Sequence, residues 1–145
     1  LVGEVRDSLR ALSATKRLRV DCEIDPHVER VVADPVRLKQ VLYNYLSNAL
    51  KFTSDGGRVV VRAIPEGARE LRLEVVDDGI GIRAEDLGLL FVEFQQLDPG
   101  KQYPGIGLGL ALTRRIVEAQ GGRVGVTSAP AKGSTFFAVL PRIAL

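Results

Sequence analysis

Apolar residues that recur every three or four positions predict helices in this chain. The longest helix is expected to begin where Asp34-Pro35 places a capping residue before a proline suited to the first helical position, and to continue to about Thr53. Three further helices are expected over residues 1–12, over residues 85–91, and from the glycine-rich stretch 105–112 to Glu118.

Alternating apolar and polar residues predict strands. Five are expected, at residues 18–24, 58–64, 71–76, 123–127 and 134–140. Pro65-Glu66-Gly67 supplies a turn between the second and the third. Helices that alternate with mostly hairpin-linked strands predict an α+β fold, a two-layer sandwich in which helices cover one face of a mixed sheet.

Composition narrows the class of protein. The 145 residues suit one domain, and 46% hydrophobic with 26% charged residues is ordinary for a globular protein. A net charge of +2 gives no argument for binding nucleic acid or a membrane, and Cys22 alone can form neither an internal disulfide nor a cysteine metal cluster. No apolar run approaches the ~18 residues of a membrane span. The chain starts at Leu1 and contains no methionine, so we expect a larger parent protein.

The predicted helix 35–53 carries a polar stripe. Asn44 and Asn48 are the only asparagines in the chain, and their spacing places them on one helix face together with Lys51. Asparagine is a mediocre helix former, so two in one stripe need a reason. The stripe is either a solvated face, or it offers amide oxygens to Mg²⁺ beside a lysine that meets phosphate. The helix alone leaves both interpretations open.

An acidic glycine turn follows the predicted strand 71–76. Asp77-Asp78-Gly79 is typical of a hairpin, but the apolar Ile80-Gly81-Ile82 that comes next suits a pocket floor better. In a pocket, a carboxylate can accept the exocyclic N–H of adenine, and glycines let the base approach the backbone.

A second glycine-rich segment has glycine at every other position, at Gly105, Gly107 and Gly109, and then becomes helical. Backbone N–H groups at such a helix start bind phosphate well. The segment is not a dinucleotide fingerprint, because no strand precedes it, and the chain contains no P-loop motif.

In this order, the segments resemble the ATP-binding catalytic domain of sensor histidine kinases, in the GHKL superfamily shared with DNA gyrase. The resemblance covers nearly the whole chain and implies a Bergerat-type ATP-binding fold. The matching motifs are the N box at residues 34–53, the first glycine box at 77–82, the F box at 90–96, the second glycine box at 105–112, and the closing Gly-x-Thr element at 133–135.

The resemblance implies roles for individual residues. Asp77 holds the adenine amino group, Lys51 meets the phosphates, and Phe94 anchors a lid. The implied catalytic residues are Asn44, Asn48 and Lys51, of which Asn48 ligates Mg²⁺ with help from Asn44. The implied nucleotide-binding residues are Asp77, Gly79, Gly81, Ile82, Phe94, Gly105, Gly107, Leu108, Gly109 and Thr135.

The implied activity is transfer of the γ-phosphate of ATP·Mg²⁺ to a histidine on a partner dimerisation domain, and from there to a response regulator receiver domain. Residues 1–15 resemble the tail of a connection to that dimerisation domain, and residues 16–145 the catalytic domain of a homodimeric parent. The resemblance also implies a cytoplasmic location for the domain, and no nucleic acid partner. His27, the only histidine, lacks the helical acidic context of a phosphoacceptor, so we do not expect the isolated chain to phosphorylate itself.

Two other functions stay open. One is a serine kinase acting on an anti-sigma partner, against which the helical residues 1–12 and Asn44 argue mildly. The other is a nucleotide-binding module without transfer activity, which the short lid between Phe94 and Gly105 would suit.

Overall fold

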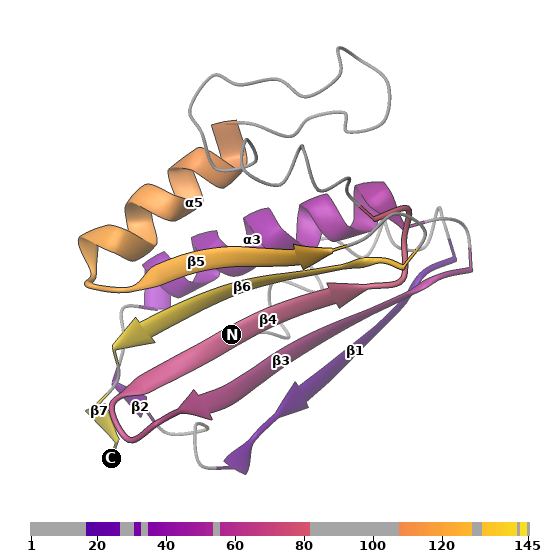
Figure 1. Ribbon diagram of the computed structural model, residues 1–145. Coiled ribbons are helices and arrows are strands. Elements are labelled where there is room, and N and C mark those ends of the chain that lie inside the picture. The colour runs from indigo at the N-terminus through magenta and orange to yellow at the C-terminus, as the bar shows by residue number, and fades with distance from the viewer. Residues whose placement is uncertain are drawn as a thin grey trace.

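The computed structural model describes residues 17–26, 31–32, 35–53, 56–81, 108–128, 132–141 and 143–144. Within these residues, two helices lie on one face of a five-stranded sheet (Figure 1). The helices are α3 (Pro35–Phe52) and α5 (Leu108–Ala119). The strands are β1 (Arg19–Ile24), β2 (Val31–Val32), β3 (Arg58–Glu66), β4 (Glu70–Asp77), β5 (Arg123–Ser128), β6 (Ser134–Pro141) and β7 (Ile143–Ala144). Neither of these helices combines the length and the apolar character that crossing a bilayer requires.

The large sheet is mixed, with the order β1-β3-β4-β6-β5. β1 runs parallel to β3, whereas β3, β4, β6 and β5 are joined by antiparallel pairs. β4 is therefore the central strand, with β3 on one side and β6 on the other. The expected α+β fold, with helices on one face of a mixed sheet, is confirmed.

Most boundaries expected from the sequence agree with the structure. α3 begins at Pro35, and all five expected strands are present with ends within two residues of those expected. The short strands β2 and β7, which pair antiparallel with each other, were not expected. Two residues are too few for a periodic pattern. The helices expected over 1–12 and 85–91, and the domain boundary at residue 15, lie outside the described residues.

The core forms where the apolar stripe of α3 packs on the sheet. Tyr45, at its centre, is fully buried, and its ring centroid lies 5.6 Å from that of Phe136 on β6. The Tyr45 hydroxyl donates a hydrogen bond of 2.9 Å to the backbone oxygen of Phe137. A buried phenol needs such a partner, so this one residue fixes α3 over β6. The other buried residues of the stripe are Leu38, Val41, Leu42, Leu46 and Ala49.

Paired charges occupy the sheet face away from the helices. Arg62 lies 3.3 Å from Glu23 and 3.7 Å from Glu74, on the strands to either side. Arg72 pairs with Glu74 at 2.8 Å, and its guanidinium carbon lies 4.0 Å from the centroid of the Phe137 ring. This is the composition of a solvated face, and each exposed pair contributes little to stability.

Removing the Tyr45 hydroxyl should measure the bond between α3 and β6. We expect Tyr45→Phe to lower the free energy of unfolding by about 0.5–1.5 kcal/mol, because the hydrogen bond to the backbone oxygen of Phe137 is lost. Urea unfolding followed by circular dichroism measures the change. Tyr43→Phe is the matched control, because Tyr43 is 46% exposed on the same helix, and it should change the free energy by less than about 0.5 kcal/mol. Equal effects of the two variants would contradict the role assigned to Tyr45.

Candidate functional site

Several elements singled out in the sequence converge at one end of the molecule. The C-terminal end of α3 lies there together with the end of β4 and the start of β6, and the first turn of α5 is directed toward the same end (Figure 1). This arrangement brings together the helix that carries Asn48, the strand that ends at Asp77, and the helix that begins at Leu108.

Asp77 is a buried carboxylic acid with one unsatisfied oxygen. Its side chain is 4% exposed, and its Oδ1 accepts a hydrogen bond of 2.9 Å from the backbone N–H of Gly79. Its Oδ2 is buried and has no hydrogen-bond partner within the described residues. Burial raises the pKa of Asp77 to about 6, although the backbone N–H groups of Gly79 and Ser134 favour the ionised form. The site therefore holds an acceptor oxygen that lacks a donor.

The turn after β4 is held by backbone bonds and by glycines. The N–H of Arg58 donates to Oδ1 of Asp78 at 3.0 Å, and the N–H of Asp78 donates to the backbone oxygen of Arg58 at 3.3 Å. Gly81 is buried with φ of 72°. Gly133 has φ of 75°, and a Cβ there would collide with the backbone oxygen of Asp77. Both glycines are needed, because L side chains rarely adopt this backbone conformation.

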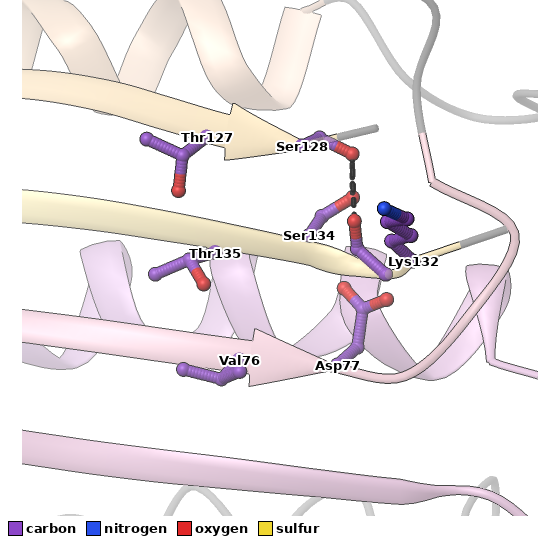
Figure 2. A pocket seen from close by; sticks show the side chains of 8 residues that line it. Val76, Asp77, Thr127, Ser128, Lys132, Ser134 and Thr135 are labelled. Carbon is purple, nitrogen blue, oxygen red and sulfur yellow. Dashed lines mark hydrogen bonds between the residues drawn. The ribbon is translucent and has the colours of Figure 1, made fainter. Parts of the chain in front are cut away.

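Ser128, Ser134 and Asp77 form a row across three strands. They are direct register partners, since Asp77 pairs with Ser134 and Ser134 with Ser128. Their side chains alternate in phase with Val75, Phe136 and Val126, which pack in the core, so the row faces the helices. The Ser128 and Ser134 hydroxyls lie 2.7 Å apart, and their side chains are directed toward each other in Figure 2. We call these three residues the polar row.

Ser134 is a site residue that the sequence did not reveal. Thr135 was expected beside the adenine, but strand alternation directs its side chain to the opposite face of the sheet. Ser134, 4% exposed, stands next to Asp77 instead. The period-2 pattern of Ser134, Phe136 and Ala138 contained the necessary signal, because it places Ser134 on the apolar face of β6.

A cavity of about 220 Å³ lies at the same strand ends (Figure 2). Val76, Thr127 and Thr135 are side-by-side partners whose alternation opposes that of the core residues, so the cavity opens on the face away from the helices. Its lining consists of Val76, Asp77, Thr127, Ser128, Lys132, Gly133, Ser134 and Thr135. The cavity and the polar row thus share Asp77, Ser128 and Ser134 as a common wall.

The asparagine stripe of α3 includes one buried residue and one residue that contacts α5. Asn48 is 5% exposed, and the amide nitrogen of Asn44 donates a hydrogen bond of 3.0 Å to the hydroxyl of Thr113 on α5. Thr113 is fully buried. The interpretation of a simply solvated face is therefore wrong for Asn48, which is buried, and Asn44 is bonded across to α5.

The remaining site residues expected from the sequence are described in part or not at all. α5 begins at Leu108 and includes Gly109, so the expected helix does follow the glycine-rich segment. The side chains of Lys51 and Leu108 are not among those described. Ile82, Phe94, Gly105 and Gly107 lie outside the described residues.

Comparisons with known proteins agree with this geometry. The sequence profile of the family described as histidine kinase-, DNA gyrase B-, and HSP90-like ATPase matches residues 33–144. The circadian input-output histidine kinase CikA of Synechococcus elongatus is 45% identical over 127 residues, which are 86% of this chain and 17% of that protein. The aerobic respiration control sensor protein ArcB of Escherichia coli is 41% identical over 135 residues, which are 90% of this chain and 17% of that protein. The crystal structure of full-length ShkA in complex with AMPPNP superposes with a TM-score of 0.88 at 29% identity, covering 99% of this chain and 30% of that one. The chain thus spans about a sixth of the length of these two relatives.

Neutralising Asp77 should stabilise the unliganded chain above pH 6. Burial raises the pKa of Asp77 from its ordinary value of 3.8 to about 6 in the folded state, so the folded state binds the proton more tightly. Stability therefore falls as pH rises from about 4 to 6, and the full penalty is present above pH 6. A shift of that size is on the order of 2–3 kcal/mol. We expect Asp77→Asn to gain up to about that amount at pH 7.5 and almost nothing at pH 4.

Urea unfolding of both proteins at a series of pH values tests this expectation. Asp78→Asn, at the exposed neighbouring residue, is the control for loss of one negative charge and should not reproduce the gain. A variant Asp77→Asn that is less stable than the parent chain at pH 7.5 would show that ionised Asp77 is favourably paired.

Proposed function

This chain belongs to the family of histidine kinase-, DNA gyrase B- and HSP90-like ATPases and is a histidine kinase catalytic domain, and from that premise we propose that it binds ATP·Mg²⁺ and donates the γ-phosphate to a histidine of a partner domain. The phosphate would then pass to an aspartate of a response regulator.

The observation that carries the proposal is the unsatisfied Oδ2 of Asp77. A buried acceptor without a donor costs about 1–3 kcal/mol, and Oδ2 has no donor within the described residues. A ligand that brings an N–H group to this point removes the cost. The exocyclic amino group of adenine is such a donor, and Gly81 leaves room for a flat base beside the carboxylate.

Asn48 is suited to the metal end of the ligand. The described residues contain no cluster of three or more His, Cys, Asp or Glu side chains that could enclose a metal ion. Mg²⁺ accepts amide and phosphate oxygens as ligands, so the buried amide of Asn48, with Asn44 beside it, fits a cation held mainly by the nucleotide. When bound, Mg²⁺ would offset the charge of the phosphates.

The phosphates themselves need donors. We assign them to Lys51 and to the backbone N–H groups of Gly105, Gly107, Leu108 and Gly109, in the glycine-rich sequence that leads into α5, with Phe94 anchoring the lid. Gly79 and Ile82 would complete the base end, and Thr135 would contribute only from the opposite face of β6. None of these donors performs chemistry, so they position the phosphate and neutralise its charge.

Asn44 favours transfer over hydrolysis. An amide cannot take a proton from water, whereas a carboxylate at this place could. The Asn44 amide nitrogen is also committed to Thr113. A site with an amide at this position cannot activate water, so it needs a nucleophile that another domain brings. We therefore propose a dimerisation and phosphoacceptor domain and a receiver domain as partners, in a homodimeric parent whose catalytic domain acts in the cytoplasm.

Asp77→Asn should weaken ATP binding by about ten- to a hundredfold, because a charged acceptor is replaced by an amide. Isothermal titration calorimetry at pH 7.5 measures the affinities. Because the pKa of Asp77 is about 6, the affinity ratio of the parent chain to Asp77→Asn should shrink as pH falls below 6, when Asp77 itself becomes neutral. The nucleotide itself titrates in the same way with both proteins, so its contribution cancels in this ratio. An unchanged affinity in the variant would remove Asp77 from base recognition.

Phosphoryl transfer should require a second domain. The chain alone, incubated with γ-labelled ATP and Mg²⁺, should incorporate almost no label and release phosphate slowly. Adding the dimerisation domain of the parent protein should give acid-labile phosphohistidine on that domain. Asn48→Ala should abolish this labelling, whereas Ser47→Ala, at the next residue of α3, should retain it. Strong labelling of the chain itself, or rapid phosphate release without a partner, would favour a different activity.

A further inference from the structure

The hydroxyl groups of the polar row have a fixed direction. The Ser128 hydroxyl donates to the backbone oxygen of Gly133 at 2.8 Å and also lies 2.7 Å from the Ser134 hydroxyl. A carbonyl oxygen can only accept, so the Ser128 proton is used on Gly133. A hydroxyl has a single proton, so Ser134 must be the donor in the second contact. Both contacts are satisfied only in this arrangement.

The direction of these bonds determines what Ser134 can offer a ligand. Its proton points to Ser128, away from Asp77, so only lone pairs remain on its oxygen for another partner. The neighbouring Oδ2 of ionised Asp77 is also only an acceptor and has no donor within the described residues. The two residues are direct register partners on β6 and β4, at 4% exposure each. Within the described residues, the base end of the site therefore presents two adjacent acceptors, Oδ2 of Asp77 and the Ser134 hydroxyl oxygen.

We propose that Ser128 is a positioning residue for base specificity: it holds the Ser134 hydroxyl as an acceptor and so selects 6-aminopurine over 6-oxopurine nucleotides. The proposal rests on the proposed function, since it requires that the base lie against Asp77. An amino group at C6 supplies donors to both acceptors. A carbonyl group at C6 instead places a third acceptor against them. Buried acceptors are then left without donors, and a polar site discriminates strongly against a ligand that has this effect.

Ser128 also has a structural role that the experiment must separate from specificity. It stands at the end of β5, and its bond to Gly133 joins the two ends of the connection to β6 (Figure 2). Loss of this bond could loosen the connection and weaken all nucleotides equally. Such loosening would not change the ratio of the affinities for two different nucleotides.

The experiment compares ATP with ITP, which carries a carbonyl at C6, by calorimetric titration of the 145-residue chain. We expect the parent chain to favour ATP on the order of a hundredfold or more. Ser128→Ala should reduce that ratio by about fivefold or more, because the released Ser134 hydroxyl can rotate and donate to the carbonyl. Ser128→Thr keeps a hydroxyl at this place and should keep the parent ratio.

A second variant keeps the test decisive if Ser128→Ala is poorly folded. A Ser134→Ala variant keeps Ser128 and its bond to Gly133 but has no acceptor hydroxyl beside Asp77, so its ATP to ITP ratio should fall by a similar factor; an unchanged ratio would overturn the specificity role. A Ser128→Ala variant that weakens both nucleotides equally would overturn the specificity role and leave the proposed function intact. A parent chain that binds neither nucleotide would overturn the proposed function and the specificity role together.

Discussion

The register of the central strand β4 is the constraint on which the site depends. β4 pairs with β3 and β6, and the partners of Asp77 are Val59 and Ser134. Because side chains alternate along a strand, a slip of one residue would turn Asp77 away from the helices and bring Val76 in. The register is fixed by apolar residues on the same face, such as Leu71, Leu73 and Val75. Gly133 then allows β6 to begin directly against the backbone of Asp77.

The same burial that positions Asp77 also makes it costly. The carboxylate is in the low-dielectric end of a core whose other members are apolar, and only one of its oxygens has a partner among the described residues. The fold tolerates this buried carboxylate because the contacts around it fix its position. Tyr45 holds α3 to β6, and the hydrogen bonds between Arg58 and Asp78 hold the turn. The site is thus a local departure from the rule that buried polar groups are satisfied, inside a scaffold that follows it.

Local patterns in the sequence predicted much of this arrangement, and the parts they missed share a physical cause. α3 could be placed from Pro35 and its apolar stripe, and Asp77 from its position between a strand and glycines. Ser128 and Asn44 could not be interpreted in this way. Their hydrogen-bond partners are distant in the fold or the sequence: Gly133 lies across a strand connection from Ser128, and Thr113 lies 69 residues from Asn44. The position of Thr135 on the opposite face of β6 from Ser134 could have been predicted, because side chains alternate along a strand. Strands of two residues, such as β2, carry no pattern to detect.

The described polar groups also give the site an orientation. At the strand ends, Asp77 and the Ser134 hydroxyl are acceptors, and they match the amino edge of a base. The first turn of α5 has the opposite character, because backbone N–H groups there lack helical partners and no acidic residue of that turn offsets them. The α3 helix contributes Asn48, a buried residue whose amide oxygen suits a cation. ATP has the same order of properties along its length, with donors at the base and negative charge at the phosphates. A ligand reversed in the site would place acceptors against Asp77 and its amino group against the helix start, so this polarity supports one direction of binding.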